Sequence, residues 1–249
     1  MNTLFFGKNC IELDVVDSTN NYAANLISTT NVHEGTVIMA HYQTNGRGQM
    51  GNVWHTEPSK NLTFSIVLHP KFLTPSTSFL LSKIVALSVK KVIDECCSPF
   101  ESQIKWPNDL IIDSKKIAGI LIENQWVKHS CTSIVGIGIN LNQTFFEPEL
   151  KATSCSLLTH TEFSTKQIME KVVEQLEQEY LKLRNGNVTE IDERYIENLL
   201  YYKQSRPYKM GQSIIQGTIE NVDNEGKLCL RLTNGSIQKF AFKEIGFIY

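Results

Sequence analysis

The sequence predicts an α+β fold in which a mixed or antiparallel sheet with helices is followed by a small C-terminal β-barrel. Several β-rich segments between residues 103 and 142 follow one another without a helix between each pair, which argues against a doubly wound parallel sheet. From about Pro207 the pattern changes to short strands separated by turn residues, which is typical of a small barrel. We therefore expect two domains, residues 1–206 and 207–249.

The N-terminal part is predicted to contain three strands and one short helix. IELDVV (11–16), TVIMAHYQ (36–43) and NLTFSIVLH (61–69) have the composition and alternation of strands. Asp17 or Ser18 can cap a short helix through NNYAANLIS, directly after the first strand. The second and third strands therefore flank a glycine-rich loop, with no long helix between them.

Caps and apolar spacing predict three further helices. Thr74 can act as an N-cap with Pro75 at the first helical position, and apolar residues then recur at helical spacing. KQIMEKVVEQLEQEYLKL (166–183) is amphipathic and is followed by Asn-Gly, a typical helix end. A further helix is expected over much of 192–202.

Short β-rich segments fill the remainder of the chain. IKW, LIID, KIAGILIE and TSIVGIGINLN supply strands to the first domain. In the second domain, NEG (224–226) and NG (234–235) are the turn signals between short strands.

Composition and charge are those of an ordinary soluble protein. The 249 residues are 41% hydrophobic and 20% charged, with a formal net charge of −2, so nothing in the overall charge predicts DNA binding. No apolar run approaches the roughly 20 residues that span a bilayer, and the N-terminus lacks the features of a secretory signal. The six cysteines form no CxxC pair, which is typical of reduced thiols in a cytoplasmic protein.

The loop TNGRGQMGNVW (44–54) satisfies the GxGxxG pattern, but its context excludes a dinucleotide site. No helix follows the glycines, and no acidic residue stands about 20 positions later to bind a ribose. A P-loop is excluded because GxxxxGK[ST] does not occur. A flexible turn between strands is one interpretation. Arg47, a fork of donors between two glycines, and Trp54, a flat surface for a planar ring, favour ligand binding instead.

KWPNDL (105–110) interrupts an apolar, β-rich region with polar residues. Pro107 favours a turn that projects Asn108 and Asp109. A plain hairpin turn is one interpretation. The alternative is a site in which Lys105 binds phosphate and Asp109 lies near a metal or an attacking amine.

KKIAGILIE and VGIGIN place a cation and three glycines in apolar strands. Lys116 begins its strand and is either solvated or directed into a pocket. Gly119, Gly136 and Gly138 leave the strands open to close approach. They predict a slot that lacks side chains, with Asn140 as its polar end.

Other catalytic patterns do not occur in the sequence. The six histidines form no HxxxH or HExxH arrangement, and there is no GxSxG elbow. Neither a nucleophilic triad nor a dedicated protein metal site is therefore expected. Lysine, arginine and backbone amides instead indicate anion handling, which suits phosphoryl or adenylyl chemistry.

Four segments together resemble the biotin protein ligases, also called biotin–[acetyl-CoA-carboxylase] ligases. They are DSTNNYA, QTNGRGQMGNVW, KWPNDL with KKIAGILIE, and GIGINLN, in the order and spacing of that family. The C-terminal segment resembles the family's small SH3-like domain. The resemblance implies a catalytic domain related to the class II aminoacyl-tRNA synthetases.

The resemblance implies a two-step, ATP-dependent reaction. Biotin and MgATP give biotinyl-5′-adenylate and pyrophosphate, and a lysine of a biotin carboxyl carrier domain then takes the biotinyl group and releases AMP. ATP, Mg²⁺ and biotin are the implied small molecules, and the metal arrives with ATP. A lipoate–protein ligase is the alternative enzyme, and a non-catalytic biotin sensor is the alternative from another class.

The resemblance also implies roles for individual residues. Biotin binding is implied for Ser18, Thr19, Asn20, Gln43, Gly46, Arg47, Lys116, Gly119, Gly136 and Gly138. ATP binding is implied for Arg47, Gln49, Trp54, Lys105, Asn108 and Asn140. Among these, Trp54 would stack on adenine. Lys116, Arg47 and Asp109 are the implied catalytic residues, with Lys116 on the reacting carboxylate and Asp109 orienting the site.

Two departures from the family pattern carry expectations of their own. Many bacterial relatives have a DNA-binding winged helix before the catalytic domain, but here the first catalytic strand starts almost at once, so we expect a ligase without DNA binding. Gln49 stands where the family usually places a basic residue. We expect weaker electrostatic closure of the loop over the adenylate unless another cation compensates. Monomer and homodimer are both expected states, because the family includes both.

Overall fold

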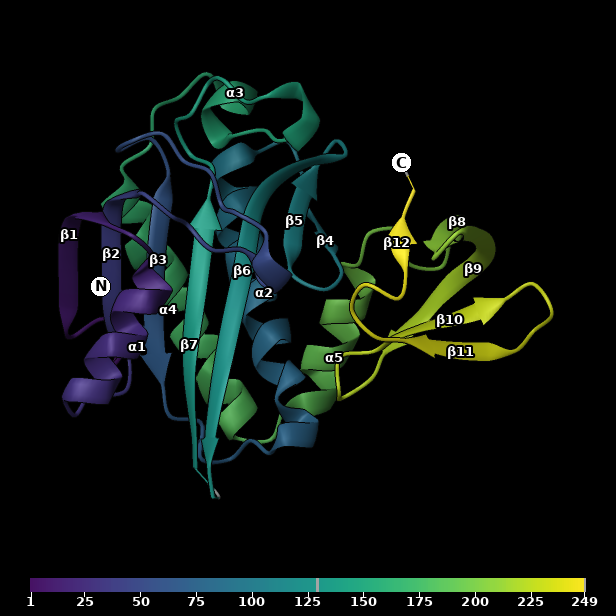
Figure 1. The fold of residues 1–249 in the computed structure, drawn as a ribbon, viewed down its shortest axis with the longest axis horizontal. Helices are drawn as coiled ribbons and strands as arrows, with labels where there is room; N and C mark the ends of the chain where they lie inside the picture. Colours follow the sequence, from purple (N-terminus) through teal and green to yellow (C-terminus); the bar gives the residue numbers. More distant parts are fainter. Residues whose placement is uncertain (129, 249) are drawn as a thin grey trace.

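The computed structural model describes residues 1–128 and 130–248 as a mixed α+β protein with two sheets (Figure 1). His129 and Tyr249 lie outside the described residues. The larger sheet is mixed, because β1 pairs with β2 in parallel and its other pairings are antiparallel. The predicted α+β class with a mixed sheet is therefore confirmed.

The larger sheet has seven strands in the spatial order β1-β2-β3-β7-β6-β5-β4. Its strands are β1 (Cys10–Val16), β2 (Thr36–Gln43), β3 (Leu62–Leu68), β4 (Gln103–Lys105), β5 (Asp109–Ile112), β6 (Lys115–Val127) and β7 (Ser130–Ile139). Each was expected from its alternation or its apolar run. The central strands β3, β7 and β6 are adjacent in space although β3 is distant in sequence. KKIAGILIE on β6 and GIGINLN, which begins on β7, therefore lie side by side.

Helices cover both faces of this sheet (Figure 1). They are α1 (Thr19–Thr29), α2 (Phe79–Cys97), α3 (Cys155–Thr159), α4 (Thr165–Arg184) and α5 (Val188–Glu197). On one face, Ala23 of α1 joins a small apolar cluster with Ile38, Val67 and Ile134. On the other face, α2 and α4 join a large cluster that continues into the second sheet. Residues of opposite parity along β2, β3 and β7 therefore face different layers.

The second sheet is antiparallel, with the order β11-β10-β9-β8-β12. Its strands are β8 (Ser205–Met210), β9 (Ser213–Val222), β10 (Leu228–Leu232), β11 (Ile237–Phe240) and β12 (Gly246–Phe247). It begins close to the boundary predicted near residue 206. The division into two domains that fold separately stays a prediction.

Buried polar contacts dock the second sheet on the first domain. Lys83 of α2 is fully buried, and its Nζ donates to Asp192 Oδ1 at 2.9 Å and to the Val222 carbonyl at 3.1 Å. Trp106 donates its indole N–H to the Gly226 carbonyl at 2.9 Å. Because a buried ammonium requires partners, these contacts hold the second sheet in one position relative to the first domain.

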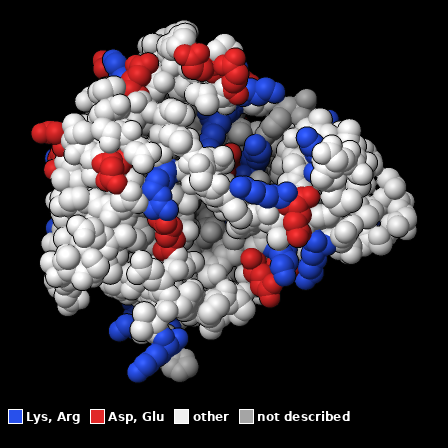
Figure 2. Space-filling view, in the orientation of Figure 1, with Lys and Arg blue, Asp and Glu red and all other residues white. Residues whose placement is uncertain are grey.

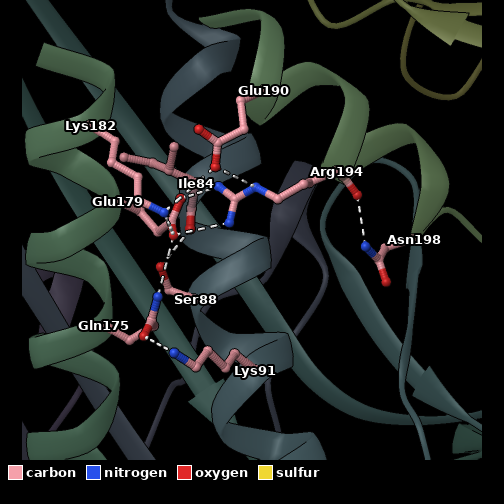
Figure 3. A network of polar contacts seen from close by, with 9 residues as sticks. All are labelled: Ile84, Ser88, Lys91, Gln175, Glu179, Lys182, Glu190, Arg194 and Asn198. Atoms are coloured by element: carbon pink, nitrogen blue, oxygen red, sulfur yellow. Dashed lines mark hydrogen bonds and ion pairs between the residues drawn. The ribbon is translucent and has the colours of Figure 1, made fainter. Parts of the chain in front are cut away.

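A second polar network joins α4 to α5 (Figure 3). Glu179 is 2% exposed and accepts a two-pronged ion pair from Arg194, with Nη1 to Oε1 at 3.1 Å. Lys182 and Gln175 donate to the same carboxylate at 3.2 and 3.3 Å. Burial raises the pKa of Glu179, but the bonds and charges of Arg194 and Lys182 together outweigh it and hold that pKa below its usual range.

Two helix predictions were imprecise. Pro75 begins a 3₁₀ turn (Pro75–Thr77) with a Thr74 capping box, and α2 starts only after Ser78. The helix expected over 192–202 is α5 (Val188–Glu197), which ends earlier because the chain after it pairs with Ile104. In the part of the chain that the structure describes, no helix is long and apolar enough to cross a membrane.

Candidate active site

A cavity of about 370 Å³ opens between the glycine-bearing strands, the start of α1, the 44–61 loop and the second sheet. Figure 2 shows the surface hollowed between the larger and smaller parts of the molecule, with Lys and Arg side chains around the hollow. The predicted residues that line it are Ser18, Thr19, Asn20, Gln43, Arg47, Gln49, Trp54, Lys105, Asn108, Asp109, Lys116, Gly119, Gly136 and Gly138. Four separate motifs therefore meet in one place. Gly46 and Asn140 do not line it.

The floor of the cavity follows from strand alternation. Gly119 on β6 pairs with Gly138 on β7, and Gly138 pairs in turn with Thr63 on β3. Paired residues point to the same face, and Gly136 lies two residues from Gly138, so it shares that face. A methyl group at Gly136 would overlap the Asn20 amide, and one at Gly138 would overlap the Trp54 ring. The glycines therefore leave the sheet open on the α1 face, as predicted, and the Asn20 amide and the Trp54 ring lie in the space above them.

One end of the slot is neutral and rich in hydrogen bonds. Gln43 Oε1 accepts from the Thr19 backbone N–H at 2.7 Å and from the Thr19 hydroxyl at 3.1 Å. Ser65 Oγ lies 2.7 Å from both Thr19 Oγ1 and Asn20 Oδ1, and its single hydrogen serves one of them at a time. Asn20 donates to Glu123 Oε2 at 2.8 Å. These short side chains are at most 8% exposed, so their geometry is fixed before a ligand enters.

The other end of the slot carries charge. Lys116 Nζ lies 2.7 Å from Asp109 Oδ1, and Lys105 Nζ lies 4.0 Å from Asp109 Oδ2. Asn108 anchors this corner to β6, because its amide and its carbonyl both bond the backbone of Ile120 at 2.9 Å. The KWPNDL turn thus places one carboxylate between two lysines at the cavity wall.

Trp54 lies on the glycine floor. Its ring packs against Gly119 and Gly138, and Lys116 Nζ lies 5.2 Å from the ring centroid. Trp54 Nε1 is buried without a hydrogen-bond partner among the residues that the structure describes. An unsatisfied buried donor costs about 1–3 kcal/mol, so this N–H is available to a ligand acceptor. Stacking on adenine was expected for Trp54, and in this structure its ring covers the glycines instead.

Gly46 closes the base of the loop. Its carbonyl accepts from the Trp54 N–H at 2.9 Å, and a methyl group at Gly46 would overlap the Trp54 carbonyl. Arg47 pairs with Val53 in an isolated β-bridge beyond it. Gly46 therefore shapes the hairpin that carries Arg47 and Trp54, and it does so from outside the cavity.

Arg47 makes a two-pronged ion pair with Glu123 on β6, with 2.7 Å from Nη2 to Oε1 and 3.1 Å from Nη1 to Oε2. Its Nη1 also donates to Asn21 Oδ1 at 2.8 Å. The Asn21 amide in turn donates to Asp17 and lowers the pKa of that carboxyl, with a smaller contribution from the Arg47 charge. Glu123 was not among the predicted residues, and its pairing depends on the register of β6.

Asn140 is 3% exposed, and its amide donates to the carbonyls of Thr153 at 3.0 Å and Lys116 at 3.4 Å. It lies behind the cavity, where it ties the segment 151–153 to the start of β6. The expected position of Asn140 at the polar end of the slot is thus corrected. The contacts that it makes hold the backbone of Lys116.

The second sheet supplies a wall that sequence reasoning missed. Its lining residues are Phe242, Lys243, Ile245, Gly246 and Phe247. Phe242 packs edge-on against Trp106, with 5.2 Å between ring centroids. No local sequence pattern indicates this wall, because its residues are far in sequence from the loop that they face.

The two ends together suit a ligand with distinct parts. A fixed neutral pocket can hold a planar ring that both donates and accepts hydrogen bonds, and the glycine floor can hold an apolar chain. Lys116 can then hold a carboxylate or phosphate where the slot meets the charged end. Arg47, whose partner Glu123 also contacts Asn20, lies on the side of the neutral end. Within the described residues, no group of three or more His, Cys, Asp or Glu side chains is placed to hold a metal ion.

A model of the biotin/lipoate A/B protein ligase family matches residues 12–140, more than half of the 249-residue chain. The chain belongs to this family. All of the predicted site residues lie inside the matched segment, whereas the wall from the second sheet lies outside it.

Named members of the family are similar over most of the chain. The "Bifunctional ligase/repressor BirA" of Bacillus subtilis is 32% identical over 250 residues, which cover 98% of this chain and 76% of that protein. The "Biotin--[acetyl-CoA-carboxylase] ligase" of Mycobacterium tuberculosis is 27% identical, covering 88% of this chain and 83% of its own length. A structure of the Aquifex aeolicus biotin protein ligase in complex with biotin and ATP has a TM-score of 0.79 at 29% identity, covering 96% of this chain and 98% of that one. The predicted resemblance to biotin protein ligases is confirmed.

Proposed function

We propose that this protein is an ATP-dependent biotin–protein ligase. It joins the carboxylate of biotin to the α-phosphate of ATP, releasing pyrophosphate, and then transfers the biotinyl group to a lysine of a biotin carboxyl carrier domain, releasing AMP. Family membership and the relatives named as biotin ligases support this activity. The carrier domain is the proposed protein partner.

The observation that carries the proposal is the two-ended cavity. Its neutral end offers both donors and acceptors from Thr19, Asn20 and Gln43, which suits the ureido ring of biotin. Its glycine floor can take the valeryl chain when the Trp54 ring that covers it moves aside, and Lys116 lies where that chain would end, close over Gly119. A ring, a chain and a carboxylate thus have matching surroundings in the right order.

Lys116 and Arg47 are the proposed catalytic cations. A carboxylate oxygen attacks the α-phosphorus, a P–O bond forms, and the bond to pyrophosphate breaks, so negative charge accumulates on the phosphate oxygens. The ammonium beside that centre, together with the guanidinium once it leaves Glu123, stabilises this charge, and one such donor is worth on the order of 10²–10³ in rate. Asp109, 2.7 Å from Lys116, orients the ammonium at the cavity wall.

Transfer to the carrier needs a nucleophilic amine at the same carbonyl. The amine of the carrier lysine attacks the mixed anhydride, forms the amide and displaces AMP, and it must lose a proton as it does so. Asp109 is the carboxylate that the cavity offers near this point, so we propose that it orients the incoming amine.

Mg²⁺ is proposed to enter with ATP. The ion usually binds a few phosphate oxygens, waters and one or two carboxylates, so it needs no protein cage. The residues lining the cavity fit this mode, since Asp109 is the acidic side chain among them. Bound Mg²⁺ would neutralise phosphate charge and so reduce repulsion of the biotin carboxylate.

Finer features of the family are proposed on the same basis. We propose that the larger sheet with its helices has the class II aminoacyl-tRNA synthetase-like arrangement, and that the second sheet is the SH3-like barrel. The mixed sheet, the short antiparallel strands and the TM-score of 0.79 to a biotin protein ligase support both. A cytoplasmic location is proposed because the six cysteines are free thiols.

Incubation with ATP, Mg²⁺, biotin and a carrier domain, followed by intact-mass measurement, tests the function. We expect the carrier to gain one biotinyl group, and lipoic acid with a lipoyl carrier in parallel to give no product. The reverse pattern would establish a lipoate ligase, and biotin binding without AMP release would indicate a sensor. In the same assay Lys116→Ala should fold but form almost no adenylate; unchanged adenylate formation would exclude its assigned role.

A further inference from the structure

The C-terminal wall of the cavity carries a lysine that contacts the glycine loop. Lys243 Nζ lies 3.3 Å from the carbonyl of Met50, at the tip of the loop and 193 residues away in sequence. Lys243 and Met50 both line the cavity. This is a direct polar contact between the second sheet and the loop that carries Arg47.

Lys243 differs in charge balance from the other cations of the cavity. Arg47 faces Glu123 at 2.7 Å, and Lys105 and Lys116 share Asp109. Across residues 1–128 and 130–248, no carboxylate lies within 4.0 Å of Lys243, whose recorded partner is a neutral carbonyl. Its positive charge is therefore not neutralised, and an uncompensated cation at a cavity mouth attracts a polyanion most strongly.

The backbone holds Lys243 in place. Its backbone φ is +69°, a left-handed conformation that residues other than glycine seldom adopt. The turn around it is closed by Glu244, whose carboxylate accepts from the Ala241 N–H at 2.7 Å. Its neighbour Phe242 packs on Trp106, which sits between Lys105 and the Pro107 turn. The backbone of Lys243 is thus held close to the charged end of the site.

We infer that Lys243 binds the pyrophosphate portion of ATP, so that the second sheet completes the nucleotide site. This inference rests on the proposed function. Lys116 is committed to the reacting carboxylate at the end of the slot, so the β- and γ-phosphates extend beyond it toward the loop tip and the opposite wall. There Lys243 leaves the Met50 carbonyl for phosphate oxygens, which are charged acceptors and stronger partners.

A purely mechanical role makes a different prediction. If Lys243 served only to fasten the loop, its loss would loosen Arg47 and Trp54 and weaken every ligand of the cavity. If it binds pyrophosphate, its loss weakens ATP and spares ligands that lack the β- and γ-phosphates. AMP and biotin are such ligands.

Binding of a non-hydrolysable ATP analogue, AMP and biotin to Lys243→Met tests the inference by calorimetry. We expect about a tenfold loss of affinity for the ATP analogue, typical of one charged hydrogen bond, and unchanged affinity for AMP and biotin. Lys243→Arg should retain most of the affinity. Lys239→Met is the matched control, because Lys239 is an exposed lysine of the same sheet, paired with Asp223 at 3.0 Å, and does not line the cavity.

The salt dependence provides a second readout. The difference between wild type and Lys243→Met should shrink as ionic strength rises, because exposed charges are screened. Equal losses for the ATP analogue and AMP, or no loss at all, would overturn the inference. Biotin-dependent ATP–pyrophosphate exchange by the wild type is measured alongside. Its absence would refute the proposed function, while the analogue titration still decides the role of Lys243.

Discussion

Two arginine–glutamate pairs in this protein have the same chemistry and different surroundings. Arg47 and Glu123 meet at the rim of the cavity, with side chains 40% and 30% exposed. Arg194 and Glu179 meet between α5 and α4, and Glu179 is 2% exposed (Figure 3). Both are two-pronged, so hydrogen-bond geometry alone does not distinguish them.

Burial and the number of partners separate the two pairs. Glu179 is also held by Lys182 and Gln175, and an unpaired buried carboxylate is costly, so this pair can only be structural. Water can replace the partners of Glu123 and Arg47, so that pair can open at little cost and give its arginine to a ligand. The same kind of ion pair is therefore a permanent structural contact between α4 and α5 and an exchangeable contact at the rim of the cavity.

The largest expected effect is on catalysis at the exposed pair. Arg47→Met should reduce the rate of biotin-dependent ATP–pyrophosphate exchange by roughly 10²–10³, because a charge-stabilising donor is lost. The exposed pair contributes at most about 1 kcal/mol, so Tm should move by no more than about 4 °C. Exchange assays and thermal melts on one preparation measure both. A large fall in Tm with normal exchange would show that the Arg47–Glu123 pair is structural and not catalytic.

The buried pair should show the opposite outcome. Glu179→Gln should lower the free energy of unfolding by about 2 kcal/mol, because Arg194 loses its charged partner but keeps Glu190 nearby, and Tm should fall by about 4–8 °C. Biotin affinity should be unchanged. Denaturant unfolding and calorimetry provide the two numbers, and a loss of biotin affinity without a change in stability would contradict the structural role.

Acid should remove the contribution of the buried Arg194–Glu179 pair to the free energy of unfolding. The pKa of Glu179 is below its usual range in the folded protein, so its contribution is complete above the unfolded value of about 4.3 and is lost as pH falls through the folded pKa. The stability difference between wild type and Glu179→Gln should therefore be constant from pH 8 to about 6 and shrink below about 4.3. Denaturant unfolding across this pH range tests it. A difference that persists at low pH would show that packing, and not charge, holds the helices.

The strands and the cavity floor could be predicted from sequence because their information is local. Alternation located β2 and β3, and glycines inside apolar runs located the slot at Gly119, Gly136 and Gly138. The end of α5 could not be predicted, because Ile104 exchanges backbone hydrogen bonds with residues 198 and 200 at 2.9 and 2.8 Å and stops the helix. That pairing joins segments far apart in sequence and overrides local helical propensity.

The candidate site also contains residues that local sequence patterns could predict and residues that they could not. Every motif residue could be proposed from sequence, since each lies in a short pattern with a chemical rationale. The partner of Arg47 could not, because Glu123 reaches it only through the register of β6 on β7. Lys243 could not either, because its contact with Met50 joins the last strands to a loop near the start of the chain.

Glu123→Gln should free Arg47 from its competing carboxylate. The amide keeps the size of the side chain and its contact with Asn20, but no longer attracts the guanidinium as a charge. Arg47 is then more available to biotinyl-5′-adenylate, whose release should slow by about three- to fivefold, as expected for an exposed pair. Chase experiments on the preformed adenylate measure this rate. Glu220→Gln is the control, because it opens the Arg231–Glu220 pair, 2.6 Å long, away from the cavity; faster release from Glu123→Gln would mean that Glu123 positions Arg47 for the ligand instead.

The smallest effect is expected where the loop lacks a second cation. Gln49→Arg adds an arginine that lines the cavity without a glutamate partner of its own, so it should slow adenylate release by about two- to threefold. The gain is limited because Lys243 already places a positive charge beside Met50, and the two cations repel each other. Asn45→Arg adds the same charge to the same loop but does not line the cavity, so its release rate should match wild type. Equal slowing by both variants would show that the net charge of the loop matters and not the position of Gln49. If Gln49→Arg slows release far more in a Lys243→Met background, repulsion between the two cations is what limits the effect of Gln49→Arg, and the exchangeable contacts at the rim extend from Arg47 to the second sheet.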